Sequence, residues 1–200
     1  IMWLLLLGHE SLPLTHSLKY FYTGSSGVPN FPEFVAVALV DEVQIGHCDS
    51  NTKRAVPKHW MNKLIEDDPQ HLEWHTANCM RSQQVFKAEL ETLKQRFNQT
   101  GGVHTYQNMY GCEWDDETGD VNGYEQFGYD GGDWLVLDLK TLTWIAPTPQ
   151  AVITKHKWDQ NKARLSFIQN FYATVCIDCL KKYLDYGKST LQRTVLPAVS

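Results

Sequence analysis

Residues 70–97, QHLEWHTANCMRSQQVFKAELETLKQRF, contain neither glycine nor proline and are rich in charged, helix-favouring residues. The stretch follows a break at Asp68-Pro69 and ends in residues 98–102, NQTGG, which have the composition of a loop. This pattern predicts one long helix between the break and the loop. The segments before and after the helix have a different character, and their order decides the fold class.

Strand-like segments precede the long helix and begin again after it. β-branched and aromatic residues are dense between residues 16 and 41, and residues 34–41, followed by Glu42, are typical of a strand that enters a tight turn. Further strand-like segments cover residues 43–48, 103–112, 123–129 and 134–139. From Pro149 to Tyr186 the composition is helical again, and Gly187 is expected to cap that second helix.

The order of elements is therefore strands followed by helices, twice. This order predicts an α+β fold in which each half contributes strands and helix. Two similar halves joined edge to edge would form a single antiparallel sheet topped by two long helices. A gap between those helices would be a groove open to a ligand.

The composition is that of a globular protein with an acidic balance. Its 200 residues are 42% hydrophobic and 20% charged, and the formal net charge is -5. No basic face is large enough to displace the counterions of a phosphate backbone, so no nucleic-acid partner is expected. Residues 1–8, IMWLLLLG, resemble the end of a secretory signal, and the apolar residues in 1–15 are expected to be packed. No apolar run reaches membrane-spanning length, so any anchor is expected outside these residues.

Several segments resemble the heavy chains of the major histocompatibility complex (MHC) class I family. They are residues 16–21 (HSLKYF), 109–112 (MYGC), 129–131 (YDG), 154–158 (TKHKW) and 190–194 (TLQRT). The resemblance implies the α1–α2 platform, with an α1 half at 16–102, an α2 half at 103–194 and about eight strands in one sheet. Residues 195–200 resemble the linker to an immunoglobulin-like domain, and residues 1–15 fall outside the resemblance. The LKY and VLP sequences are most similar to those of bony-fish members.

The resemblance implies a disulfide between Cys112 on the sheet and Cys176 on the last helix. Closing a loop of about 64 residues would stabilise the fold by about 4 kcal/mol in the chain-entropy model. A redox motif formed by Cys176 and Cys179 is the competing interpretation, but this pair lies deep in a helix and not beside a βαβ unit. Cys48, Cys79 and Cys179 have no partner in the family pattern and are expected to be free thiols.

Asn98 opens an N-glycosylation acceptor sequence, Asn98-Gln99-Thr100, with no proline in the middle. It lies where the long helix ends and a surface turn begins, and the resemblance implies a glycan at this position. Because short acceptor sequences are frequent by chance, the prediction depends on this position more than on the motif.

The two ends of the groove match peptide-presenting family members to different degrees. At the amino-terminal end, Tyr20 and Tyr183 match two of the tyrosines that enclose the amine of a peptide. His71 and Phe171 replace the other two, and phenylalanine cannot donate a hydrogen bond. Leu72 stands where the family usually has tryptophan. The resemblance therefore implies an altered amino-terminal end.

The carboxylate end matches the family better. Thr154, Lys157 and Trp158 match the residues that bind the carboxylate of a peptide. Arg96 stands where mammalian members have tyrosine and non-mammalian members have arginine, and its planar guanidinium can bind a carboxylate or a carbonyl. The alternative is a solvated arginine that only faces the negative end of the helix dipole.

A stripe of mixed polarity on the long helix is expected to face the groove, because its members recur at three- and four-residue steps. The stripe consists of His75, Asn78, Cys79, Ser82, Val85, Phe86, Glu89, Thr92 and Leu93. Strand alternation adds floor residues Tyr22, Asn108, Tyr110, Glu125 and Phe127. An apolar pocket near the carboxylate end is expected from Leu93, Tyr106, Phe127, Trp134 and Trp158. The alternative, a stripe that is merely buried, is disfavoured because unpaired buried polar groups are costly.

Catalysis and metal binding are not predicted. His75 and Cys79 lie one helical turn apart but supply too few ligands for zinc. His47 and Cys48 are neighbours on a strand, where adjacent side chains point to opposite faces. No nucleophile, base and orienting group can be assembled from the spacing, so no enzyme activity, cofactor or metal is expected.

Two functions remain open from the sequence. The first is presentation of a short peptide to T-cell or natural-killer receptors, with β2-microglobulin under the sheet. It implies the secretory pathway and the cell surface, and it is also compatible with a secreted form. The second is a divergent class I-like recognition or carrier protein that does not bind conventional peptides. The residues of the carboxylate end favour the first function, and those of the altered amino-terminal end favour the second.

Overall fold

The computed structural model describes residues 15–195, with the backbone alone for residues 192–195. The packing expected for residues 1–15 therefore lies outside the described residues, apart from Thr15 at the start of the first strand. The linker expected at residues 195–200 lies outside them as well, apart from the backbone of Val195.

The strands form a single eight-stranded antiparallel sheet in the order β4-β3-β2-β1-β5-β6-β7-β8. They are β1 (Thr15–Ser26), β2 (Phe34–Val40), β3 (Val43–Asp49), β4 (Val56–Pro57), β5 (His104–Asp115), β6 (Val121–Tyr129), β7 (Gly132–Asp138) and β8 (Thr143–Ile145). β1 and β5 pair along their whole length and join the two halves in the middle of the sheet. The short strands β4 and β8, at the edges of the sheet, have no counterpart among the predicted segments.

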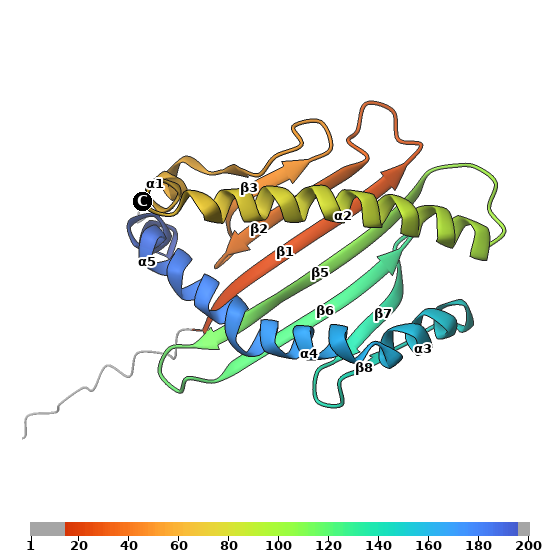
Figure 1. Ribbon diagram of the computed structural model, residues 1–200. Helices are drawn as coiled ribbons and strands as arrows, with labels where there is room; N and C mark the ends of the chain where they lie inside the picture. Colours follow the sequence, from red (N-terminus) through yellow and green to blue (C-terminus); the bar gives the residue numbers. More distant parts are fainter. Residues whose placement is uncertain (1–14, 196–200) are drawn as a thin grey trace, which may run out of the picture.

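The helices lie on one face of this sheet, in two rows separated by a gap (Figure 1). One row consists of α1 (Asn62–Asp67) and α2 (Pro69–Arg96), preceded by a 3₁₀ turn at His59–Met61. The other consists of a 3₁₀ turn at Pro149–Ala151, α3 (Val152–Gln160), α4 (Lys162–Asn170), a π-helical turn at Phe171–Val175 and α5 (Cys176–Val195). The predicted α+β fold, with one antiparallel sheet from two halves under two helical rows, is confirmed.

The bounds of α2 follow from its sequence and agree with the predicted helix at 70–97. Pro69 occupies the first turn, where its missing N–H costs nothing and its fixed φ suits a helix. Lys94 and Arg96 stand in the last turn, where positive charge interacts favourably with the helix dipole.

The predicted cap at Gly187 is wrong, because α5 continues to Val195. Gly187 is buried within the helix, and a Cβ atom added there would lie 2.5 Å from the ring of Trp60. The absence of a side chain therefore lets α5 lie close against the 3₁₀ turn that carries Trp60. Gly187 serves packing between the two halves and not helix termination.

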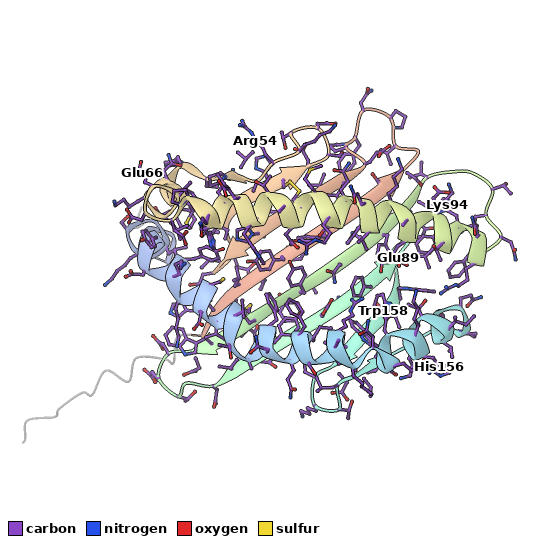
Figure 2. All side chains as sticks on the ribbon, viewed as in Figure 1. Arg54, Glu66, Glu89, Lys94, His156 and Trp158 are labelled. Atoms are coloured by element: carbon purple, nitrogen blue, oxygen red, sulfur yellow. A yellow bond between two sulfur atoms is a disulfide. The ribbon has the colours of Figure 1, made fainter. Side chains whose placement is uncertain are left out.

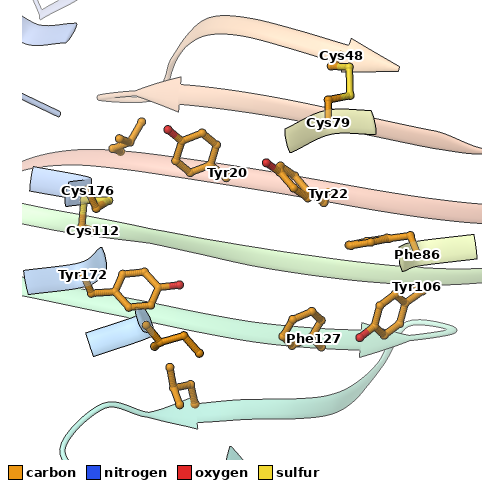
Figure 3. Packing of buried hydrophobic residues seen from close by; sticks show 14 of the residues in the cluster. Tyr20, Tyr22, Cys48, Cys79, Phe86, Tyr106, Cys112, Phe127, Tyr172 and Cys176 are labelled. Carbon is orange, nitrogen blue, oxygen red and sulfur yellow. A yellow bond between two sulfur atoms is a disulfide. The ribbon is translucent and has the colours of Figure 1, made fainter. Parts of the chain in front are cut away.

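Two disulfides tie helices to the sheet, and Figure 3 shows both. Cys112 on β5 is bonded to Cys176 on α5, as the resemblance implied. Cys48 on β3 is bonded to Cys79 on α2, with their Cα atoms 6.5 Å apart, so the prediction that these two are free thiols is wrong. Among the described cysteines, Cys179 alone is free.

The strand register explains why Cys48 meets the helix. Cys48 is paired with Ala36, and Ala36 is paired with Tyr22, whose side chain faces the groove. Residues opposite each other in antiparallel strands share a face, so Cys48 also points toward the helices. This alignment depends on which strands pair and in which register, and the cysteine spacing does not reveal it.

Candidate functional site

Two adjacent rows of side chains form the centre of the groove floor. Pairing of β1, β5 and β6 aligns Tyr20, Tyr110 and Glu125 in one row and Tyr22, Asn108 and Phe127 in the next. The hydroxyl of Tyr110 lies 2.9 Å from that of Tyr22, and the Asn78 amide from α2 donates to the Tyr22 hydroxyl at 3.1 Å. The floor is thus linked to the α2 wall by polar contacts.

A cavity of about 430 Å³ lies over this floor, between α2 and α4. Figure 2 shows two residues of its lining, Glu89 on α2 and Trp158 on α3. The residues expected at the groove that line this cavity are Tyr22, Asn78, Ser82, Val85, Phe86, Glu89, Tyr106, Asn108, Tyr110, Glu125, Phe127, Trp158 and Phe171. The volume is within the usual range for pockets that hold small ligands.

The same cavity has further lining residues that the sequence did not indicate: Trp74, Arg81, Arg164, Phe167, Ile168 and Tyr172. Arg164, Phe167 and Ile168 lie on α4, whose direction over the sheet is set by its break from α3 at Asn161. The Asn161 side chain caps α4 by accepting from the backbone N–H of Arg164. The cap residue was the one available sequence signal for this helix start.

The π-helical turn at Phe171–Val175 explains a mismatch in the resemblance. Matching both Trp158 and Cys176 to the family requires one extra residue between them, and a π-turn accommodates one extra residue in a helix. The turn places Tyr172 over the floor at Gly123, where an added Cβ atom would lie 2.8 Å from the Tyr172 side chain. Phe171 is partly exposed, and its ring lies 6.1 Å from that of Tyr110.

A second cavity of about 90 Å³ lies under the first half of α2, where α5 also approaches. Expected site residues Tyr20, His71, His75, Cys79 and Tyr183 line it, together with Leu72. The Cys48–Cys79 disulfide forms part of its wall, and its remaining lining is mainly apolar. The volume suits a few atoms and not an extended chain.

A network of neutral groups joins α2 to α5 beside this small cavity. The Tyr183 hydroxyl lies 2.7 Å from Nε2 of His71 and 2.9 Å from Nε2 of His75, and the two Nε2 atoms are 3.2 Å apart. Burial, and to a lesser extent the nearby His71, lowers the pKa of His75 to about 4. Burial also lowers the pKa of His71, so both imidazoles are neutral at pH 7.

Two further contacts, both exposed, join the two helical rows at the same end of the groove. The Lys182 ammonium lies 3.3 Å from the Asp68 carboxylate, and the Tyr186 hydroxyl donates to the Asp67 carboxylate at 3.0 Å. Tyr183 is only 2% exposed. Its hydroxyl is therefore engaged by the histidines and not presented to a free amine.

At the opposite end, Arg96 bridges α2 to the other helical row. Its Nη1 donates to Thr154 Oγ1 at 2.5 Å and to the Gln150 carbonyl at 3.2 Å, and the guanidinium lies 5.6 Å from the centre of the Trp134 ring. Arg96 is therefore not a merely solvated arginine. Lys157 is exposed nearby and has no ion pair among the described residues.

The aromatic residues expected to form an apolar pocket at this end are packed against one another. The rings of Phe127 and Trp158 lie 5.1 Å apart, those of Tyr106 and Phe127 5.6 Å apart, and Trp134 is 1% exposed. Leu93 is fully buried and, like Trp134, lines neither cavity. Entry of a ligand side chain into this cluster remains a prediction.

Arg96, Thr154 and Lys157 also line neither cavity, and Thr92 and Asn98 lie away from both as well. Thr92 is exposed, and its hydroxyl donates to the Ala88 carbonyl in its own helix. Asn98 is exposed in the turn after α2, with φ of 53°. The accessibility of Asn98 is compatible with a glycan, which remains a prediction.

Known proteins share this sequence pattern. Residues 14–191 match the family described as class I histocompatibility antigen, domains alpha 1 and 2. The mouse major histocompatibility complex class I-related protein 1 is 41% identical over 92% of this chain and 54% of its own length. The mouse class I antigen K-K alpha chain is 37% identical over 91% of this chain and 50% of its own length. The chicken class I antigen F10 alpha chain is 36% identical over 94% of this chain and 54% of its own length.

The matches cover only part of each relative, and the described residues contain neither a membrane-spanning helix nor a metal-binding cluster. The chain spans about half the length of the relatives it matches. Between residues 15 and 195, no helix is long and apolar enough to cross a membrane. In the same range no group of three or more histidine, cysteine or acidic side chains is arranged to hold a metal ion. The fold, the paired halves and the family match together show that this chain belongs to the MHC class I family, as its α1 and α2 domains.

Proposed function

We propose that this chain is the ligand-binding platform of an antigen-presenting molecule and that its groove holds a short peptide mainly by the carboxylate half. The observation that carries the proposal is the bridge from Arg96 to Thr154 and Gln150, which fixes a guanidinium at one end of the groove. Lys157 adds a second positive charge beside it. Charged hydrogen bonds to a carboxylate are stronger than neutral ones, so this end can anchor a free carboxyl terminus.

β2-microglobulin is the partner proposed under the sheet. Phe21 lies between Tyr20 and Tyr22 on β1, so its side chain points to the face opposite the groove. It is 38% exposed there, on a central strand. An exposed aromatic residue in the middle of a sheet is favourably covered by another protein surface. T-cell or natural-killer receptors are proposed for the opposite face, over the helices, at the surface of a cell.

The experiment is to refold the chain with β2-microglobulin and a random peptide library, and to identify the acid eluate by mass spectrometry. Peptides with a free carboxyl terminus and an aliphatic last residue are expected. A library amidated at the carboxyl terminus should be recovered far less. Equal recovery of the amidated library would contradict the role of Arg96.

A second function is favoured by the closed α5 end. The contacts of His71, His75 and Tyr183 occupy the position where a peptide amine would be held. A divergent class I-like carrier or recognition protein, which takes a ligand without a conventional amino-terminal anchor, would fit this arrangement. An eluate that lacks peptides but contains another compound would support it over peptide presentation. Neither function includes a catalytic step.

A further inference from the structure

Glu125 places a carboxylate in the middle of the groove floor. It stands on β6, opposite Tyr110 on β5, and is partly exposed to the cavity of about 430 Å³. The Tyr172 hydroxyl donates to its Oε2 at 3.1 Å. Within residues 15–195 this is the one hydrogen bond that Glu125 makes through its side chain, which leaves Oε1 available.

No positive group of the described chain contacts this carboxylate. The nearest candidate, Arg164, lies with its guanidinium over the Trp158 ring at 4.2 Å and near the Trp144 ring at 5.7 Å. It forms no ion pair within 4.0 Å of Glu125 among the described residues. Two tryptophan faces therefore hold Arg164 to the side of the cavity.

Glu89 adds a second carboxylate to the same cavity from the α2 wall. Burial raises the pKa of both glutamates; Arg164 opposes the shift at Glu125, and Lys157, Arg96 and Arg164 oppose it at Glu89, in each case without a contact within 4.0 Å among the described residues. The charged forms are thus disfavoured by the loss of water and are not compensated by a contacting cation. A positive ligand group in this cavity, in contact with Glu125, would supply the missing interaction there.

The remaining lining includes Arg81 and Arg164, and it also has aromatic residues. Tyr110, Phe127 and Phe171 present aromatic rings to the cavity, and ring faces attract positive groups. A carboxylate under aromatic walls is the chemistry that recognises a guanidinium or an ammonium. An anionic or purely aliphatic group would leave both carboxylates without a contacting cation.

We propose that Glu125 on the floor, with Glu89 on the α2 wall of the same cavity, is a subsite for a cationic side chain of the ligand, an arginine or a lysine at its middle. The cation binds Oε1 of Glu125 while Tyr172 holds Oε2. This inference rests on the proposed function, in that the ligand lies in the groove. It adds a central anchor of defined charge to the carboxylate anchor at Arg96.

Fragment binding tests the subsite directly. The probes are Nα-acetyl-arginine methylamide and its neutral isostere Nα-acetyl-citrulline methylamide, titrated calorimetrically into the whole chain. The arginine probe should bind about tenfold more tightly or better, which is the gain expected for a charge-assisted pair. Equal binding of the two probes to the unmodified chain would overturn the proposal without any variant.

Variants locate the effect. Glu125→Gln should abolish the preference for arginine, Glu89→Gln should reduce it by a smaller factor, and Glu125→Asp, which keeps the charge, should retain part of it. Glu73→Gln, on the exposed side of α2, is the matched control and should leave the preference unchanged. A preference that survives in a folded Glu125→Gln variant would also overturn the assignment.

The peptide library separates this inference from the proposed function. Enrichment of arginine or lysine at one central position, lost in Glu125→Gln while the carboxyl-terminal preference remains, supports both. Peptides without any enrichment of arginine or lysine would contradict the cationic subsite but would still support peptide presentation. An absence of peptides together with a retained arginine preference in the fragment titration would reject presentation and support the subsite.

Discussion

The two ends of the groove bridge the same two helical rows with opposite chemistry. At the α5 end, His71, His75 and Tyr183 form a buried network of neutral groups. At the α3 end, a partly exposed arginine bonds Thr154 and a carbonyl. Burial removes charge from imidazoles, whose pKa is near neutrality, but not from a guanidinium, which stays protonated in proteins. The bridge at the α5 end is therefore uncharged, whereas the bridge at the α3 end carries a positive charge that attracts anions.

The difference shows that a residue able to form hydrogen bonds at one end of the groove does not by itself make that end a ligand-binding site. Tyr183 matches a peptide-binding tyrosine of the family, yet its hydroxyl is occupied by two histidines from α2. Arg96 also has partners within the chain, but a guanidinium carries several N–H donors, and those on the atoms other than Nη1 remain for a ligand. We therefore expect ligand binding to depend on the α3 end and stability to depend on the α5 end.

The Cys48–Cys79 disulfide lies against the small cavity at the α5 end, and its removal should have the greatest effect on stability. Closing a loop of 31 residues is worth about 3–4 kcal/mol in the chain-entropy model, so Cys48→Ser with Cys79→Ser should lower the unfolding free energy by that amount. Urea denaturation measures the change. Cys179→Ser, which breaks no disulfide, is the control.

Thiol counting checks the same assignment without a variant. Under denaturing, non-reducing conditions, one free thiol per chain is expected, from Cys179. Three free thiols would restore the interpretation of Cys48 and Cys79 as unpaired and would remove the covalent tie from the α5 end.

Arg96→Ala should weaken binding of a peptide with a free carboxyl terminus by about 10- to 150-fold, because charged hydrogen bonds contribute about 1.5–3 kcal/mol. An amidated peptide should be affected much less. Fluorescence polarisation of labelled peptides measures both. Arg54→Ala, in an exposed loop, removes a charge elsewhere and should leave both affinities unchanged. Equal losses for the two peptides would mean that Arg96 acts through packing alone.

The α5 end should make stability depend on pH. His75 has a pKa of about 4 in the folded chain and the ordinary 6.5 when unfolded. Between these values the unfolded chain binds more protons, so stability falls as pH decreases from about 6.5, by up to about 1.4 kcal/mol per pH unit. His75→Asn should flatten this slope in thermal unfolding between pH 7 and 5, whereas His156→Asn, exposed on α3, should not. An unchanged slope in His75→Asn would contradict the buried neutral state.

A direct comparison of the ends uses Tyr183→Phe and Lys157→Ala. Tyr183→Phe removes a neutral hydroxyl that faces histidines, so its effect on peptide affinity should be smallest, at most about 0.5–1.5 kcal/mol. Lys157→Ala should weaken binding more, because it removes a charge beside Arg96. The two affinities are measured with the same labelled peptide. A greater loss for Tyr183→Phe would reverse the proposed roles of the ends.

The sequence by itself determined the elements and their order. Absence of glycine and proline from residues 70–97 set the long helix, and strand alternation correctly assigned Tyr22, Asn108 and Phe127 to one face. These properties are local, since they depend on dihedral preferences and on the two-residue repeat of a strand. The family resemblance added the Cys112–Cys176 bridge. Likeness to bony-fish members and glycosylation of Asn98 stay predictions.

Only the tertiary structure decided which distant residues meet. The pairing of β3 with β2 brought Cys48 under Cys79, and the approach of α5 to Trp60 turned Gly187 from an expected cap into a packing position. The π-turn brought Tyr172 to Glu125, although the sequence around neither residue indicates this contact. Such contacts depend on register, helix direction and burial across the whole sheet, and no local preference encodes them.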